Sequence, residues 1–383
     1  MTALNPELTD LSLEQLRLRR SAKWRYYDKD VLPAWVAEMD FPLAAPVQIA
    51  LAEAVELGDT GYGYPDALGL AEAFAGFAAA RLGWEVDPAR VGALPDVVNG
   101  ITSVLRLISK PGDRVVINTP VYHPFFGIIE ELGCEVAEVP LVDGELDVDA
   151  VDEEFRRGAV AIILCSPHNP LGTLPTEAQL NALGASAAAN GAWVLSDEIH
   201  WPLTLPGARH VPFLSVSEEA REHGIAFVSA SKAFNLAGLT CAQTVTASAR
   251  AAELIAKLPF AASHAGHFGL LASVAAYRDG AAWLDDVIAV VDHNRALLAE
   301  LLAATLPEVA YTPPRAGYLT WLDLRPLGLG DDPCEALLER GRLALNPGPA
   351  FGPQGKGHAR LNIGTSPALV EEAVQRIGKA VGR

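Results

Sequence analysis

Three polar residues, Asn169, Asp197 and Lys232, each stand just after a short apolar run of the sequence. The runs are predicted to be buried strands, and ligands of open α/β sheets bind beyond the carboxyl ends of the strands. We therefore expect the three side chains to meet at one edge of a sheet. An amide, a carboxylate and an amine gathered there can donate to an oxygen, pair with a cationic nitrogen and bond covalently to a carbonyl carbon.

Lys232 is the residue that would form the covalent bond. A lysine near a strand end is most often a solvated surface group, but this chain has only seven lysines, and this one lies in the run Ser229-Ala-Ser231-Lys232. The two hydroxyls can bind an anion beside the amine, and a desolvated amine near a cationic ring has a lowered pKa. The pattern predicts that Lys232 holds pyridoxal 5′-phosphate (PLP) as a Schiff base.

The other strand-end residues fit the same cofactor. Asp197 could simply cap the next helix, but its carboxylate could also keep the pyridine nitrogen protonated, so that the ring accepts electrons. Asn169 lies in SPHNPLGT, where Asn-Pro could be only a turn. In the functional interpretation its amide donates to the phenolic oxygen of the ring. His200, three residues after Asp197, could reach the same edge, although an isolated histidine is usually structural.

Two further segments could bind anionic groups. The run DVVNGITSVL opens a predicted helix, where Gly100 and Ile101 would bring main-chain N–H groups to the cofactor phosphate. Arginines mostly lie on the surface, but Arg360 in HARLNIGTS opens an apolar run. A guanidinium held in this way is a candidate clamp for the α-carboxylate of a substrate.

The elements that must position these residues alternate along the chain. Helical segments such as TEAQLNALGASAAANG separate the apolar runs, and this alternation predicts an α/β fold with a largely parallel sheet. We place the large PLP-binding domain at residues 46–285. Residues 1–45 and 286–383 are predicted to form a smaller α+β domain. The predicted strands are RVVIN (Arg114–Asn118), AVAIILC (Ala159–Cys165), AWVLS (Ala192–Ser196), IAFVSA (Ile225–Ala230) and YLTWLDL (Tyr318–Leu324), and a long helix is predicted over Ala281–Ala304.

Composition argues against several other kinds of protein. The 383 residues carry a formal net charge of −18 without a Lys/Arg-rich block, which argues against nucleic acid or an anionic membrane as the main partner. No run approaches the roughly 18 to 20 apolar residues of a membrane span, and the first twenty residues do not resemble a signal peptide. The four cysteines form no CxxC pair, so we expect neither a metal site nor disulfides, and a cytoplasmic location.

Taken together, PHNPLGT, SDEIH, SASKAFN and ARLN, in this order, resemble the fold-type I PLP enzymes, the aspartate aminotransferase superfamily. Further segments resemble one branch, the cystathionine β-lyases or C–S lyases. One departure from typical aspartate aminotransferases is that Thr240 stands where they carry a phosphate-binding arginine, eight residues after the lysine. His200 replaces a common tyrosine. The segments resembling the branch are KWRYYDKDVLPAWVAEMDFP (Lys23–Pro42), GYGYP (Gly61–Pro65), TPVYHPF (Thr119–Phe125) and LNPGPAFG (Leu345–Gly352).

The resemblance implies roles for residues that spacing alone does not single out. Tyr122 should stack on the cofactor ring, and Tyr64 should reach the phosphate of a neighbouring subunit in a homodimer whose sites lie at the interface. Trp35 and Ala37 should line the substrate entrance and help to seat the carboxylate. Lys232 would act as the base that removes the Cα proton.

The resemblance to this branch implies cleavage of a sulfur-bearing amino acid such as L-cystathionine to a thiol, pyruvate and ammonia. An aminotransferase shares the early chemistry and remains the alternative. A purely regulatory protein that binds a transcription factor is disfavoured because Lys232, Asp197, Asn169 and Arg360 are all present, but a regulatory binding role beside the enzymatic activity stays open. A dinucleotide-dependent oxidoreductase is disfavoured because no G-x-G-x-x-G follows an early strand with an acidic residue downstream.

Overall fold

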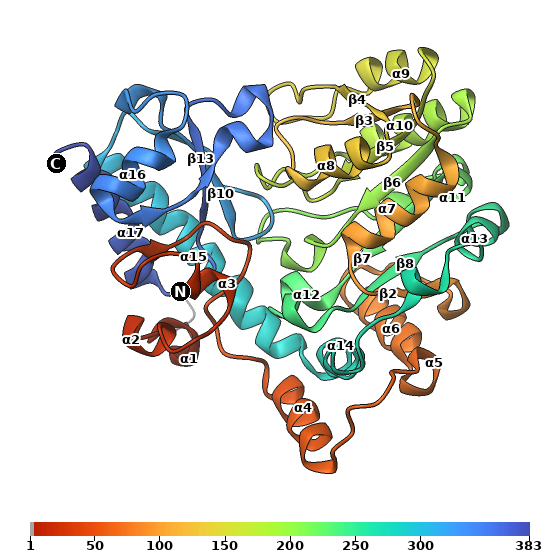
Figure 1. Cartoon of the computed structure of the whole chain (residues 1–383), viewed down its shortest axis with the longest axis horizontal. Coiled ribbons are helices and arrows are strands. Elements are labelled where there is room, and N and C mark those ends of the chain that lie inside the picture. The colour runs from red at the N-terminus through yellow and green to blue at the C-terminus, as the bar shows by residue number, and fades with distance from the viewer. Residues whose placement is uncertain (1–3) are drawn as a thin grey trace.

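A seven-stranded sheet forms the centre of the larger part of the computed structural model, which describes residues 4–383 (Figure 1). All neighbouring strands pair in parallel except β8, which is antiparallel to both of its neighbours. The predicted α/β fold with a mainly parallel sheet is confirmed. In spatial order the strands are β2 (Val91–Leu94), β8 (Ala242–Val245), β7 (Gly224–Val228), β6 (Trp193–Asp197), β5 (Ala159–Cys165), β3 (Arg114–Ile117) and β4 (Glu135–Glu138).

Side chains of the sheet alternate between two hydrophobic cores because successive residues of a strand face opposite sides. Val115 and Ile117 of β3 pack in one core with α7 (Val97–Ile108), α8 (Pro124–Glu131) and α13 (Ala249–Ile255), whereas Val116 packs in the other. The second core is covered by α4 (Ala45–Leu57), α6 (Leu70–Leu82), α9 (Val148–Arg156), α10 (Glu177–Asn190), α11 (Glu218–His223) and α14 (His267–Asp279), while α5 (Pro65–Leu68) and α12 (Ala230–Ala233) are short.

Helix α10 shows how the sequence sets an element's limits. Thr176 and Gln179 form a reciprocal capping box at the start, and Gly191 ends the helix in the left-handed conformation at φ 69°. These residues frame the segment whose periodicity predicts a helix. The predicted strand over 159–165 coincides with β5, since a continuous apolar run buried on both faces is typical of a central parallel strand.

A second, antiparallel sheet of four strands lies in the C-terminal part. The N-terminal segment, red in Figure 1, lies beside this part of the molecule. Strand β1 (Leu32–Pro33) joins it by pairing in parallel with β11 (Leu343–Ala344). The four strands, in spatial order, are β12 (Asn346–Pro347), β13 (His358–Asn362), β10 (Leu319–Asp323) and β9 (Ala310–Tyr311), and the helices around them are α1 (Pro6–Thr9), α2 (Leu13–Leu16), α3 (Ala22–Arg25), α15 (Ala281–Thr305), α16 (Pro333–Gly341) and α17 (Pro367–Ala380).

The predicted domain limits remain predictions, and the limit at 285/286 falls inside helix α15, which connects the two parts without a break. All four cysteines are buried and free. Within residues 4–383 no helix is long and apolar enough to cross a membrane, and no group of three potential metal ligands is found.

Candidate active site

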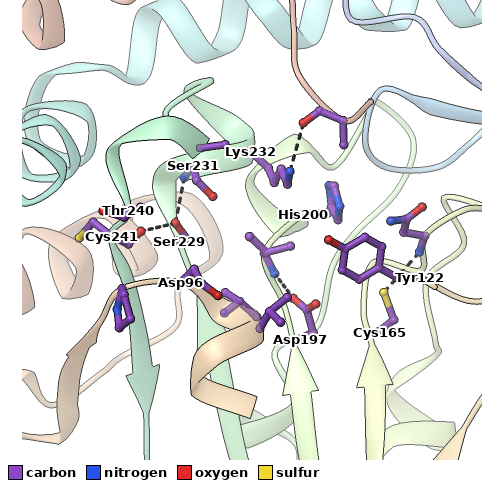
Figure 2. Close-up of a pocket in the computed structure, with 17 residues that line it drawn as sticks. Asp96, Tyr122, Cys165, Asp197, His200, Ser229, Ser231, Lys232, Thr240 and Cys241 are labelled. Atoms are coloured by element: carbon purple, nitrogen blue, oxygen red, sulfur yellow. Dashed lines mark hydrogen bonds between the residues drawn. The ribbon is translucent and has the colours of Figure 1, made fainter. Parts of the chain in front are cut away.

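The carboxyl ends of β5, β6 and β7 open into one cavity, as the strand-end residues predict (Figure 2). Lys232, Asp197 and Asn169 all line it. In Figure 2, Ser229, Ser231 and Thr240 lie at one end of the cavity, and Tyr122 and Cys165 lie at the other. The remaining lining residues are Ala37, Pro95, Asp96, Val97, Val98, Ile199, His200, Ala237 and Cys241.

Lys232 lies in the short helix α12, whose first turn is capped by Ser229. Its Nζ atom donates to the main-chain carbonyl of Ala37 at 3.1 Å. Burial, reinforced by the positive charge of Arg360, lowers the pKa of Lys232 to about 8. A fraction of the amine is therefore neutral near physiological pH, which a nucleophile or a base requires.

Asp197 is the last residue of β6 and only 5% exposed. One carboxylate oxygen accepts the main-chain N–H of Ile199 at 3.1 Å. Burial raises the pKa of Asp197 to about 7, because a carboxylate loses hydration in an apolar setting. A cationic ring nitrogen placed against this side chain would compensate that loss.

Asn169 and His200, which also line the cavity, present groups suited to a ring oxygen. The Asn169 Oδ1 atom accepts a hydrogen bond from Arg360 at 3.0 Å, which leaves its amide N–H groups to donate. Burial lowers the pKa of His200 to about 3, so its imidazole is neutral, and its Nδ1 atom is buried without a hydrogen-bond partner in the described chain. The ring of Tyr122 packs edge-on against Phe125, with centroids 5.5 Å apart.

The start of α7 differs in detail from the sequence expectation. Val97 and Val98 line the cavity, whereas Gly100 and Ile101 do not. A Cβ atom at Gly100 would collide with Leu94 and lie 3.1 Å from the Phe227 ring, so this glycine permits close packing of the helix on the sheet. The N–H groups that can reach a phosphate belong to Val97 and Val98 in the first turn of the helix, three residues earlier than expected.

The two serines before Lys232 are also not equivalent. The Ser229 hydroxyl donates to the Cys241 carbonyl at 2.6 Å and accepts the Ser231 N–H at 3.0 Å. Its single proton is thus used within the protein, and Ser231 carries the hydroxyl that can bind an anion. Thr240 lies nearby with φ 54°, in the left-handed region.

Arg360 reaches the same site from the other sheet. It lies in β13, is 2% exposed, and donates to the Trp35 carbonyl at 2.9 Å as well as to Asn169. Its guanidinium carbon lies 5.0 Å from the Phe351 ring centroid, a cation–π distance. Burial lowers the pKa of Arg360 to about 10, so it remains positively charged at neutral pH.

Tyr64, like Gly100 and Ile101, lies outside the cavity and its hydrogen-bonded rim. It is 64% exposed and lines a separate surface hollow with Tyr62 and Phe260. The side chain therefore does not line the cavity of its own chain.

Three residues that sequence reasoning missed hold the segment that carries Trp35 and Ala37. They are Asn235, Tyr318 and Asn362. Asn235 and Asn362 fall inside the motifs SKAFN and ARLN, so the motifs marked the region. Spacing alone could not reveal that their side chains bond to a segment about 200 to 330 residues away.

Comparison with known proteins agrees with this geometry. The family model described as aminotransferase class I and II matches residues 32–377. A Mycobacterium leprae (strain TN) protein, provisionally named a cystathionine β-lyase, is 42% identical, covering 98% of each chain. The cystathionine β-lyase of Corynebacterium glutamicum is 36% identical over 96% of this chain and 99% of its own. The crystal structure of cystalysin from Treponema denticola, which contains PLP, is 26% identical over 99% of each chain, with a TM-score of 0.91.

The chain belongs to the aminotransferase class I and II family, and it is a PLP-dependent enzyme. The cavity fits that cofactor on its own evidence. Asp197 supplies a buried carboxyl group suited to a ring nitrogen, and Asn169 supplies an amide. The amine of Lys232 lines the same cavity as Val97 and Val98 in the first turn of α7, where a phosphate can bind.

Proposed function

We propose that this protein is a carbon–sulfur β-lyase that cleaves L-cystathionine or a related cysteine S-conjugate to a thiol, pyruvate and ammonia. With cystathionine the thiol is homocysteine. The names of the full-length relatives support this reaction. The observation that carries the chemistry is the buried cavity that brings the amine of Lys232 together with the carboxyl group of Asp197.

The residues of the cavity divide the work of binding the cofactor. Asp197 would hold the ring nitrogen of PLP, Asn169 and neutral His200 would bind its phenolic oxygen, and Tyr122 would pack beside the ring. Ser231 and the first turn of α7 would bind the phosphate, and Ser229 supports Ser231 by accepting its main-chain N–H. When bound, PLP supplies the electron sink that stabilises negative charge at Cα.

The remaining residues act on the substrate. Arg360 binds the α-carboxylate, and the buried setting strengthens that ion pair. Lys232, with a pKa of about 8, accepts the Cα proton near neutral pH. Trp35 and Ala37 line the entrance, and their carbonyl groups hold the two cations before substrate arrives. Loss of the thiol from Cβ then leaves 2-aminoacrylate, which water converts to pyruvate and ammonia.

We also propose that the enzyme acts as a homodimer in which Tyr64 of each subunit completes the phosphate site of the other. The exposed position of Tyr64, outside its own cavity, supports this arrangement.

The test is to incubate the purified holoenzyme with L-cystathionine and to follow both free thiol and pyruvate. Equal release of thiol and pyruvate without any added acceptor supports the lyase. If a keto acid forms only when a 2-oxo acid is added, and no thiol appears, the protein is an aminotransferase. The Lys232→Ala variant should lose both the activity and the visible absorption band of the bound cofactor, and an intact band would exclude Lys232 as the anchor.

A further inference from the structure

The segment from Trp35 to Phe41, here called the N-terminal strap, lies across the cavity and contacts both parts of the molecule. The Ala37 carbonyl accepts hydrogen bonds from Lys232 Nζ and from the Tyr318 hydroxyl, each at 3.1 Å. Two residues earlier, the Trp35 carbonyl accepts from Arg360 at 2.9 Å. Lys232, assigned to proton transfer, and Arg360, assigned to carboxylate binding, therefore both donate hydrogen bonds to main-chain carbonyls of the strap.

Asn362 holds the strap on the side of the four-stranded sheet. Its Nδ2 atom donates to the carbonyls of Val36 and Glu38, at 2.7 Å each, and these residues flank Ala37. Its Oδ1 atom accepts the N–H of Gly364 at 2.7 Å, which fixes the orientation of the amide. Asn362 is 3% exposed, so water cannot easily replace these bonds.

Asn235 holds the strap on the side of the seven-stranded sheet. Its Oδ1 atom accepts the Met39 N–H, and its Nδ2 atom donates to the Met39 carbonyl, both at 2.9 Å. This reciprocal pair resembles the pairing of two strand residues, and it fixes the main chain of Met39 on both sides of its Cα atom.

Each asparagine is close in sequence to one of the two cations. Asn235 is three residues after Lys232, and Asn362 is two residues after Arg360. The strap thus joins the two elements that carry the reacting amine and the carboxylate clamp. A shift of the strap would move the Ala37 carbonyl away from Lys232, and an ångström of misplacement at a reacting group costs up to roughly 100-fold in rate.

We propose that Asn235 and Asn362 are positioning residues that hold the N-terminal strap so that the Ala37 carbonyl directs the amine of Lys232 toward the substrate Cα. This inference rests on the proposed role of Lys232 as the base. It does not depend on which bond breaks afterwards.

The variants are chosen to remove the amides and little else. Asn235 has φ 59°, in the left-handed region, so Asn235→Gly removes the side chain without adding backbone strain. Asn362→Ala removes the second anchor. If Asn362→Ala does not fold, Asn362→Asp keeps the size of the side chain and its acceptor for the Gly364 N–H but cannot donate to the strap.

Asn294→Ala provides a matched control. Asn294 is fully buried, and its Nδ2 atom donates to the carbonyls of Ile363 at 2.9 Å and Thr365 at 2.7 Å. It is therefore another buried amide that bonds two main-chain carbonyls just beyond β13, but none of its bonds reaches the strap. Its substitution measures the general cost of losing such an anchor.

The measurement is the exchange of the Cα proton of L-alanine for deuterium, followed by proton NMR with each holoenzyme at saturating cofactor. L-Alanine has no leaving group, so exchange reports proton transfer alone. We expect Asn235→Gly and the Asn362 variant to exchange about 10- to 100-fold more slowly than the parent enzyme at saturating alanine, with Asn294→Ala within about threefold of it. In the two strap variants the acidic limb of the pH–rate profile for exchange should also move to lower pH. The reason is that the ammonium form of Lys232 loses a fixed hydrogen-bond acceptor, which lowers its pKa.

The proposal is overturned if the two strap variants exchange alanine as fast as Asn294→Ala does. It is also overturned if the fractional decrease in their exchange rate equals the unfolded fraction measured by circular dichroism. Failure of the proposed function looks different. A parent enzyme that exchanges alanine but releases no thiol from cystathionine is not a lyase, and the strap proposal still stands. If Lys232→Ala exchanges alanine as fast as the parent, Lys232 is not the base, and both the proposed role and the strap proposal fail.

Discussion

At the scale of single residues, position at a strand end was the strongest signal in the sequence. It identified Lys232, Asp197 and Asn169, and the structure brings all three into one cavity. It could not show which hydroxyl is free, because the hydrogen bond of Ser229 is made to a residue twelve positions later. Nor could it reveal the buried pKa values, which depend on the surroundings and not on residue type.

Asp197→Asn tests the proposed partner of the ring nitrogen. Asparagine retains an oxygen that can accept the Ile199 N–H but cannot balance a positive charge. Breaking a buried charge pair costs about 3–5 kcal/mol, so we expect kcat/KM with L-cystathionine to fall roughly 100- to 5,000-fold. The thermal midpoint of the protein without cofactor should not fall, because the variant removes a buried titratable group. Unchanged kcat/KM would remove Asp197 from its assigned role.

The lowered pKa of Lys232 makes the capture of cofactor depend on pH in a defined way. A lysine whose pKa is about 8 becomes neutral at lower pH than an ordinary lysine, and only the neutral amine reacts with the aldehyde. We expect the rate of PLP binding to the cofactor-free protein to rise through pH 8 and then to level off.

Stopped-flow absorbance measures that rate, and Nα-acetyl-lysine in parallel corrects for ionisation of PLP itself. A corrected rate that continues to climb toward the ordinary lysine pKa of about 10.4 would contradict the low pKa.

At the scale of elements, the sequence predicted the long and buried segments well. Strand β5 and helix α15 lie within a residue of their expected limits, because continuous apolar runs and long periodic segments leave few alternatives. The two-residue strands β1 and β11 carry no such pattern. Their pairing, which ties the N-terminal segment to the C-terminal part, is a tertiary contact between residues more than 300 positions apart.

Gly100→Val tests the revised account of α7. Gly100 is buried against Leu94 and Phe227, so a branched side chain there overpacks the contact between helix and sheet. We expect a loss of about 1–3 kcal/mol in the free energy of unfolding, measured with urea. The dissociation constant for PLP, measured where the variant is fully folded, should stay within about threefold of the parent value. The reason is that the main-chain N–H groups available to the phosphate are those of Val97 and Val98.

Gly76→Val is the matched control for that experiment. Gly76 lies in helix α6 with no atom within 4 Å of the added Cβ, so this substitution changes helix propensity alone. A Gly100→Val protein as stable as Gly76→Val, but with weakened PLP binding, would restore Gly100 to the phosphate site.

At the scale of the whole molecule, the resemblance contributed what patterning could not. The expectation that Tyr64 reaches the phosphate of a neighbouring subunit comes from the resemblance alone, because no periodicity in the sequence indicates it. The structure places Tyr64 on the surface beside a hollow formed with Tyr62 and Phe260. The predicted domain limits are drawn from the alternation of strands and helices and remain predictions, and one of them falls within the continuous helix α15.

A subunit-mixing experiment tests the proposed shared site. Tyr64→Ala and Lys232→Ala are each expected to lower activity strongly, but a mixed dimer contains one site with both native residues. After unfolding and refolding an equal mixture, random pairing gives half mixed dimers, so about one quarter of the parent activity should return. Size-exclusion chromatography checks the dimer. If the refolded mixture is no more active than the average of the two variants alone, Tyr64 does not act across subunits.

The N-terminal strap has a consequence for protein engineering. Residues 35–41, 232–235 and 360–362 lie far apart in the sequence but form one hydrogen-bonded unit. Chimeras made by joining this chain to its relatives should therefore inherit all three segments from the same parent. A crossover near residue 45 would leave every helix and strand of the two main sheets intact and still separate the strap from the side chains that hold it.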